Sequence, residues 1–272
     1  MRHRVPIIIG SLLTVLVAAV FYYAFIAPAK SQQAKVQKQA QQAPAPAYRH
    51  PLNGVPLDEK LDFFAISVMY DNLAEVAKHP GLDQARIVYE ALTEGGITRF
   101  MAVYDSTQQV VEIGPVRSVR PYFIDWAMEY RGALMHVGGS QDALQQLKKI
   151  PDSDLVDVDQ IGADEQYFSR DESLKAPHNV FTNFSSWLKL GERLDIQPKI
   201  ITSWKFDEIK APSEMAQQID IAYSPGNHVS WVYDGPAHTY VRFLNANRQL
   251  ATTGEQLRAS SVVLLEVTST TI

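Results

Sequence analysis

Two arginines, Arg117 and Arg120, stand three residues apart in the segment 114–121, which reads GPVRSVRP. This segment is expected to join a loop to a helix, where unpaired backbone N–H groups already favour an anion. The planar fork of arginine suits a carboxylate or a phosphate. Together with Arg99, these residues are candidates for an anion-binding site. The alternative is that they pair with the protein's own Asp and Glu side chains.

Two carboxylates, Glu90 and Glu94, precede the pair Gly95-Gly96 and are candidate acid–base groups. If residues 88–94 form a strand, both side chains lie on one face, about 13 Å apart at ~3.3 Å per residue. That separation is too large for two carboxylates acting on one bond unless the strand bends. The alternative is a solvated face or an ion pair with Arg99.

The segment 136–140 reads HVGGS and is expected to run from a strand through a glycine turn into a helix. Such a turn exposes backbone N–H groups, and Gly138 and Gly139 would let a ligand approach closely. Ser140 could be a nucleophile beside His136, although serine in this position typically caps the helix. His136 is either a general base or a buried, hydrogen-bonded histidine.

A polar loop over 169–179 carries His178 and Asn179. His178 follows a proline in an expected ordered turn and is a second acid–base candidate. The histidines show no paired helix spacing for a metal, and no phosphate-loop or dinucleotide pattern occurs. The sequence also has no cysteine. We therefore expect no metal site and no cofactor.

These residues need a mixed scaffold of strands and helices. A buried strand is expected at 63–70, and two β-rich runs at 87–94 and 97–104 predict a hairpin about Gly95-Gly96, although 83–93 could instead be a helix. Amphipathic patterns and caps predict the remaining elements of this part. They are a strand at 134–137 and helices at 118–130, 141–149 and 183–194, the last with Trp187 and Leu188 on its apolar side.

From about residue 200 the pattern changes to short alternating strands separated by turn residues, which predicts a small antiparallel β module. The expected strands are 218–223, 229–233, 240–244 and 262–267. The predicted fold class is therefore α+β, with a mixed α/β domain at 51–195 and a β-rich module at 196–272.

The chain has 272 residues, of which 46% are hydrophobic and 20% charged, enough for one large or two ordinary domains. Residues 1–50 hold six Lys and Arg and no acid, which leaves 19 basic and 30 acidic residues after them, a net charge of −11. A nucleic-acid surface needs the opposite sign, so the charge disfavours that class of partner and we expect no nucleic-acid binding.

The N-terminus predicts a single membrane span. Residues 5–27 carry no charge, and about 20 apolar residues cross the hydrocarbon core. We expect a cytoplasmic tail at 1–4, a transmembrane signal-anchor at 5–28 and a flexible Gln/Ala/Pro linker at 29–50. A cleaved signal peptide is the alternative, because Ala27-Pro28-Ala29 has the form of a cleavage site. The basic residues that flank the span are nearly balanced, and the short N-terminal tail favours an extracytoplasmic location for the rest of the chain.

Several motifs resemble the YerB-type family, a family of envelope proteins described as lipoproteins with a domain of unknown function. They lie at 81–100, 114–123 (GPVRSVRPYF), 136–140 (HVGGS), 175–179 (KAPHN) and 253–257 (TGEQL). The resemblance covers roughly residues 51–272. It implies a bacterial envelope protein outside the cytoplasmic membrane, with a larger α/β module and a smaller β module, and it implies no established activity. Family members usually continue through further strands, so the resemblance leaves open whether the β module is complete here. Because the sequence has no lipid-acceptor cysteine, a membrane helix is expected in place of the lipid anchor.

Three functions remain open from the sequence. The first is binding of a cell-wall-derived or anionic ligand, or a partner protein, through Arg99, Arg117, Arg120 and the 136–140 turn. The second is an extracytoplasmic hydrolase or transferase acting on envelope polymers, with Glu90 or Glu94 and His136 or His178 as acid–base groups. The third is a membrane-tethered scaffold for another envelope protein.

Overall fold

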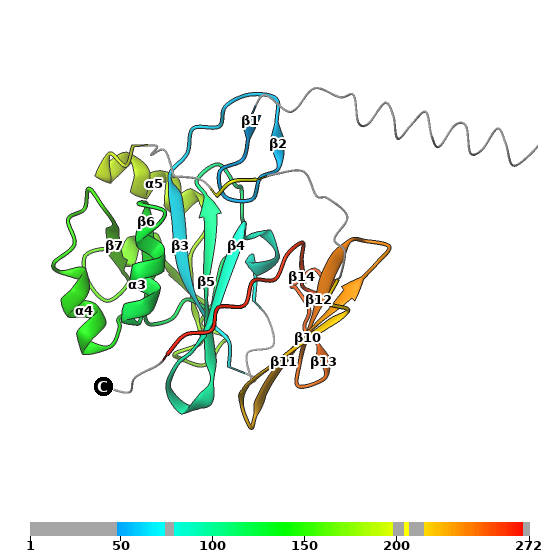
Figure 1. The fold of residues 1–272 in the computed structure, drawn as a ribbon. Coiled ribbons are helices and arrows are strands. Elements are labelled where there is room, and N and C mark those ends of the chain that lie inside the picture. Colours follow the sequence, from blue (N-terminus) through cyan, green and yellow to red (C-terminus); the bar gives the residue numbers. More distant parts are fainter. Residues whose placement is uncertain (1–47, 74–78, 198–203, 207–214, 269–272) are drawn as a thin grey trace, which may run out of the picture. The chain divides into compact units, whose positions relative to one another are not determined.

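The structure is a computed structural model that describes residues 48–73, 79–197, 204–206 and 215–268. A central mixed sheet has the strand order β4-β5-β3-β6-β7 (Figure 1). β4 and β5 run antiparallel to one another and β5 runs antiparallel to β3, whereas β6 and β7 are parallel to β3. The strands are β3 (Ala65–Asp71), β4 (Ile87–Leu92), β5 (Thr98–Asp105), β6 (Ala133–His136) and β7 (Val156–Asp159).

β3 and β5 are buried at every position, as expected for central strands covered on both faces. Alternate residues of β3 enter two separate apolar cores, with Ile66 and Val68 in one and Ala65 and Met69 in the other. The helices α3 (Pro121–Met128) and α4 (Gln141–Leu147) contribute to the second core, and α5 (Phe184–Leu194) contributes Trp187 and Leu190 to the first. The strand and helix contents expected for 51–195 are therefore confirmed.

The helix starts follow local hydrogen-bonding chemistry. Pro121 occupies the first turn of α3, where its missing N–H costs nothing. The Ser140 hydroxyl accepts a hydrogen bond from the Ala143 amide at 3.3 Å, and the Asn183 side chain caps α5 in the same way. The prediction for the apolar side of α5 was wrong at Leu188, which is exposed, because the buried face instead repeats from Trp187 to Leu190.

The hairpin between β4 and β5 is confirmed, and the helical alternative for 83–93 is not observed. The connection includes the short 3-10 turn η3 (Glu94–Gly96). Gly95 and Gly96 have positive φ angles of 69° and 75°, which glycine adopts without a steric cost.

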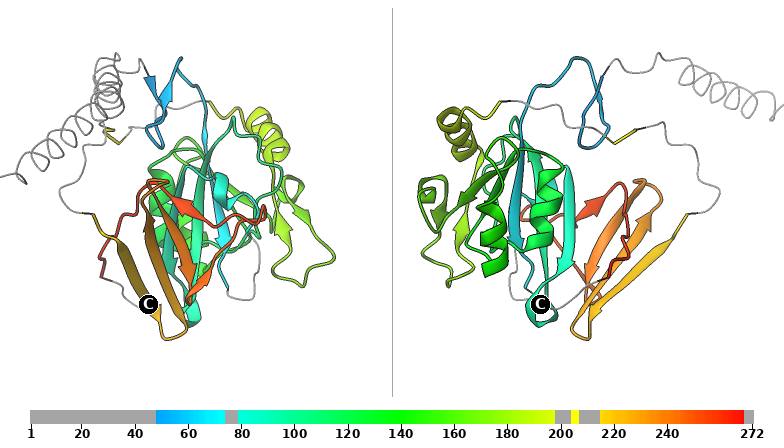
Figure 2. Two further views of the ribbon diagram at one scale, coloured as in Figure 1. Left: turned by 90° about the vertical axis from the view of Figure 1, so that its right-hand side faces the viewer. Right: turned by 60° about the vertical axis from the view of Figure 1, so that its left-hand side comes forward.

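A second, antiparallel sheet follows, as predicted, with the order β10-β11-β12-β13 and β14 also paired with β12. It lies beside the β4–β5 side of the central sheet (Figures 1 and 2). Its strands are β10 (Gln218–Ser224), β11 (Asn227–Asp234), β12 (Thr239–Leu244), β13 (Asn247–Arg248) and β14 (Arg258–Ala259).

The strand predicted at 262–267 was wrong. Residues 261–268 have no strand assignment, and Val263, Leu264, Leu265 and Val267 are 59–70% exposed. Their β-branched and apolar character favours a strand, but within the described part of the chain no strand edge pairs with them.

Short elements complete the unit, and the sequence patterns did not indicate them. They are β1 (Tyr48–Arg49), β2 (Pro56–Leu57), β8 (Ser169–Arg170), β9 (Val180–Phe181), η2 (Leu82–Gln84) and η4 (Glu165–Tyr167). The linker predicted at 29–50 was wrong in its last three residues, because Tyr48 and Arg49 form β1 and the buried His50 ring lies 3.1 Å from the Asp105 carboxylate.

The transmembrane segment predicted at 5–28 and the linker up to residue 47 lie outside the described residues. Within the ranges that the structure describes, no helix combines the length and the apolar character that crossing a bilayer requires.

Candidate functional site

The candidate site lies at one edge of the central sheet. Because β3, β6 and β7 are parallel, their carboxyl ends meet at the same edge, and they end in Asp71, His136 and Asp159. β5 begins there, with Arg99 directly opposite Asp71. Ligands of open α/β sheets typically bind at this kind of edge.

The segment 114–121 crosses this edge and is held there by backbone pairing. The Arg117 amide donates to the Met69 carbonyl at 3.0 Å, and the Arg117 carbonyl accepts from the Val137 amide at 3.1 Å. The Val119 amide donates to the Gly138 carbonyl at 3.0 Å. The GPVRSVRP and HVGGS motifs are therefore neighbours in space.

The Asp71 carboxylate joins the two loops of this edge. Its Oδ2 lies 2.6 Å from Nδ1 of His178 and 3.0 Å from Nε of Arg117. The Arg117 N–H is not aligned with that oxygen, so the second contact is an ion pair without a hydrogen bond. Arg117 also donates to the Pro177 carbonyl at 3.1 Å. Asp71 is buried, whereas the His178 side chain is 29% exposed.

A second carboxylate, that of Glu94, holds Arg99 and Arg120. Arg120 contacts both oxygens of Glu94, at 2.7 Å for the Nη2–Oε2 pair, and Arg99 Nη2 lies 4.0 Å from Oε2. The hydrogen bonds from Arg120 are the main reason that the pKa of Glu94 falls to about 2. Glu94 remains 64% exposed.

Arg99 is the most deeply placed of the three arginines. It donates to the Ser118 carbonyl at 2.8 Å, and burial, then repulsion by Arg120 and Arg117, lowers its pKa to about 10. We call Arg99, Arg117, Arg120, Asp71, Glu94 and His178 the arginine site. Its three guanidinium groups face two carboxylates, so one positive charge is uncompensated.

Glu90 belongs to a different network. Both of its oxygens lie 2.7 Å from Nη2 of Arg242, and it also accepts from Thr98 and Asn72 at 2.8 and 3.1 Å. Arg242 stacks over Phe100 and Trp231, so this buried ion pair connects the two sheets. The expectation that Glu90 and Glu94 share a strand face was wrong, because β4 ends at Leu92 and Glu94 lies in the turn.

His136 is completely buried at the end of β6. Its Nε2 lies 2.6 Å from the Asp157 carboxylate and its Nδ1 2.9 Å from the Gly138 carbonyl. The structure therefore places His136 in a hydrogen-bonded interior position, away from solvent.

The glycine turn after β6 packs against the segment 114–121, which carries Arg117 and Arg120. A Cβ on Gly139 would lie 2.9 Å from Cγ1 of Val119, and the Gly138 amide donates to Asp159 at 2.7 Å. Asn179 is also buried and accepts from Arg170 at 3.1 Å. Gly138, Gly139, Ser140 and Asn179 thus hold the loops of the site, and their contacts are with the protein itself.

The residue that sequence reasoning missed is Asp71. The usable signal was its position, because it is a carboxylate at the carboxyl end of a mostly apolar strand. No local spacing could link it to His178, which is 107 residues away in the chain.

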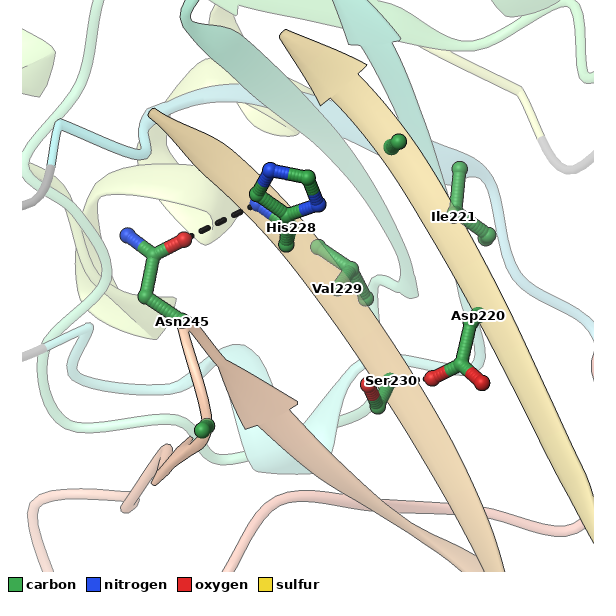
Figure 3. Close-up of a pocket in the computed structure, with 8 residues that line it drawn as sticks. Asp220, Ile221, His228, Val229, Ser230 and Asn245 are labelled. Carbon is green, nitrogen blue, oxygen red and sulfur yellow. Dashed lines mark hydrogen bonds between the residues drawn. The ribbon is translucent and has the colours of Figure 1, made fainter. Parts of the chain in front are cut away.

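A shallow pocket lies elsewhere, on β10 and β11 of the second sheet (Figure 3). Two pairs of its polar groups already bind one another. Ser230 donates to Asp220 at 2.6 Å, and the His228 amide donates to Asn245 at 2.9 Å. None of the residues of the arginine site lines this pocket.

Within residues 48–73, 79–197, 204–206 and 215–268, no three His, Asp or Glu side chains are placed together to hold a metal ion.

The mixed sheet and its helices form an α/β module with the site at one edge. The antiparallel sheet that follows forms a β module, as the resemblance implied. Residues 52–197 match the N-terminal domain of DUF3048, described as a protein of unknown function, and the chain belongs to this family.

Two comparisons identify individual relatives of this chain. The chain is 30% identical over 214 residues to the Bacillus subtilis (strain 168) protein named "Putative lipoprotein YerB", covering 76% of this chain and 63% of that protein. It therefore spans less than two thirds of the length of this relative. The crystal structure of YerB from Bacillus subtilis matches with a TM-score of 0.67 at 27% identity, over 78% of this chain and 72% of that one.

Proposed function

We propose that this protein is an extracytoplasmic envelope protein, anchored to the cytoplasmic membrane by one N-terminal span, that binds an anionic group of a cell-envelope molecule at the arginine site. The apolar run 5–27 and the lipoprotein name of the relative support the envelope location. Since this sequence has no cysteine to carry a lipid, a helical span is the proposed anchor.

The observation that carries the proposal is the convergence of Arg99, Arg117 and Arg120. They come from two segments, and they gather in a folded part whose net charge is −11. This local positive charge is unexpected in a part of the chain that is negative overall. The carboxylates of Asp71 and Glu94 compensate only part of it. An anion at the sheet edge would complete the balance.

Accessibility fits a ligand as well. The Arg117 and Arg120 side chains are 18% and 15% exposed, so each is partly desolvated but can be reached from solvent. Hydrogen bonds between charged groups contribute roughly 1.5–3 kcal/mol in such surroundings. Glu94 already shows that this position accepts a carboxylate.

The contacts of the candidate acid–base residues argue against the hydrolase alternative. Glu90 is paired with Arg242, and the buried His136 is hydrogen-bonded to Asp157. Neither side chain is therefore placed to contact a substrate. His178 is left with Asp71 as its partner, and neither Glu90 nor Glu94 contacts it.

Binding is tested with purified cell-wall material and the described domain in cosedimentation assays. We expect Arg117→Ala and Arg120→Ala to weaken binding at least tenfold, and Arg258→Ala, whose exposed ion pair with Asp234 lies on the second sheet, to leave binding unchanged. Thermal unfolding confirms that each variant is folded. Equal binding by all three variants would refute the proposal.

The location is tested separately with protease added to intact cells that express the full chain. We expect the part from residue 51 onward to be digested while the cells remain intact. Survival of that part, or a mature chain that begins near residue 30, would contradict the anchored extracytoplasmic topology.

A further inference from the structure

We infer that His178, oriented by Asp71, determines the specificity of the arginine site by accepting a hydrogen bond from a hydroxyl group of the ligand. The ligand class is then a hydroxylated anion, such as a polyol or sugar phosphate. The inference rests on the proposed function, because it requires that the arginines bind the anionic group.

The orientation of the imidazole follows from its partner. Nδ1 of His178 lies 2.6 Å from Oδ2 of Asp71, and an ionised carboxylate can only accept, so the proton is on Nδ1. In the neutral ring, Nε2 then carries a lone pair. Among the described residues Nε2 has no hydrogen-bond partner, and the side chain is 29% exposed, so this acceptor is open to solvent.

The position of this acceptor follows from Arg117. Arg117 and His178 contact the same oxygen of Asp71, at 3.0 and 2.6 Å, and Arg117 also donates to the carbonyl of Pro177, the residue before His178. The two side chains are therefore direct neighbours. The inference is that an anion held by Arg117 brings its adjoining atoms within reach of Nε2.

The chemistry of Nε2 selects the adjoining group. A lone pair repels the oxygens of the anion itself but attracts an O–H donor. Asp71, which contacts the imidazole, is also paired with Arg117, so these two charges offset one another in this contact. A site with a fixed acceptor discriminates against an analogue that lacks the hydroxyl, because the acceptor is then left unpaired.

The test compares glycerol 1-phosphate with propyl phosphate, which has the same three-carbon chain without hydroxyls. Calorimetry is done at pH 8, where an imidazole is ordinarily neutral. We expect the folded protein to bind glycerol 1-phosphate about tenfold more tightly. In His178→Ala the ratio falls to about one, with propyl phosphate affinity unchanged. The matched control is His228→Ala, an exposed histidine on β11, which keeps the tenfold ratio.

A second measurement does not depend on the folding of a variant. In long-range proton–nitrogen NMR spectra of the unsubstituted protein, we expect the Nε2 signal of His178 to shift on addition of glycerol 1-phosphate and not of propyl phosphate. Equal affinities for the two compounds, or a ratio that survives His178→Ala, would overturn the inference and leave the arginine site standing. If neither compound binds, both the inference and the proposed function fail.

Discussion

Both oxygens of the Glu94 carboxylate accept hydrogen bonds from Arg120, although the Glu94 side chain is mostly exposed to water. An internal carboxylate thus occupies the guanidinium fork that an anionic ligand would need. Because Glu94 lies on the turn between β4 and β5, it can leave this position without disturbing either strand. The arrangement suggests direct competition between Glu94 and the ligand.

We predict that Glu94→Gln raises the affinity for propyl phosphate about two- to fivefold, since exposed ion pairs contribute about 0.2–1 kcal/mol. The stability of the fold should change little for the same reason. Calorimetric titration measures the affinity, and Glu112→Gln, an exposed glutamate outside the site, is the control. Unchanged or weaker binding by Glu94→Gln would show that the two carboxylates do not compete.

Stability should depend on pH through His79, whose buried ring has its pKa lowered to about 4, mainly by burial. Between pH 6.5 and 4, His79 binds a proton in the unfolded chain but not in the folded protein. The stability of the fold therefore decreases as the pH falls through this window. The loss attributable to His79 is about 3 kcal/mol at pH 4. Carboxylates with lowered pKa values, such as Glu94 and Asp105 at about 2, lose their contribution only at lower pH.

His79→Phe separates this effect from the others, because phenylalanine preserves the edge-on ring contact with Phe100 and cannot titrate. Urea unfolding at pH 7 and pH 4 should show a smaller pH-dependent loss in the variant. The same loss in both proteins would assign the pH dependence to other groups.

The buried pair Glu90–Arg242 should be a principal link between the two sheets. Arg242→Met leaves Glu90 buried without its cation and should lower the free energy of unfolding by about 3–5 kcal/mol. Adding Glu90→Gln should recover part of that loss, since the uncompensated charge is removed. Arg258→Ala, at a more exposed ion pair, should cost below about 1 kcal/mol. Similar small losses for Arg242→Met and Arg258→Ala in denaturant titrations would contradict the assignment.

Gly139 should influence binding without facing the ligand. Its substitution by alanine places a methyl group 2.9 Å from Val119 Cγ1 and 3.2 Å from the Val119 carbonyl, so the segment that carries Arg117 and Arg120 must shift. We predict weaker propyl phosphate binding by Gly139→Ala in a fold that persists. Gly226→Ala, where an added Cβ meets nothing within 4 Å, should bind normally. Normal binding by Gly139→Ala would mean that the segment is not held by this contact.

Local patterns predicted the elements whose causes are local. The Gly95-Gly96 hairpin, the Ser140 cap and the Pro121 helix start follow from backbone chemistry within a few residues. The strand at 262–267 failed for the opposite reason, since a strand needs a partner edge that the segment itself does not contain.

The site was predictable in its residue types and unpredictable in its pairing. The Arg117 and Arg120 spacing indicated an anion site, but the balance among Asp71, Glu94 and the arginines depends on sheet register and on loops far apart in the chain. Glu90 shows the same limit, because its partner Arg242 is 152 residues away.

The most direct measurement of the central claim is a titration of the folded protein with propyl phosphate, followed by NMR of the arginine side-chain Nε–Hε groups. The arginine site predicts saturable shifts of the Arg99, Arg117 and Arg120 signals with a single dissociation constant, and no shift of Arg242, which is buried in its pair with Glu90. Stationary signals from the three arginines at saturating phosphate, or equal shifts across all arginines, would contradict it.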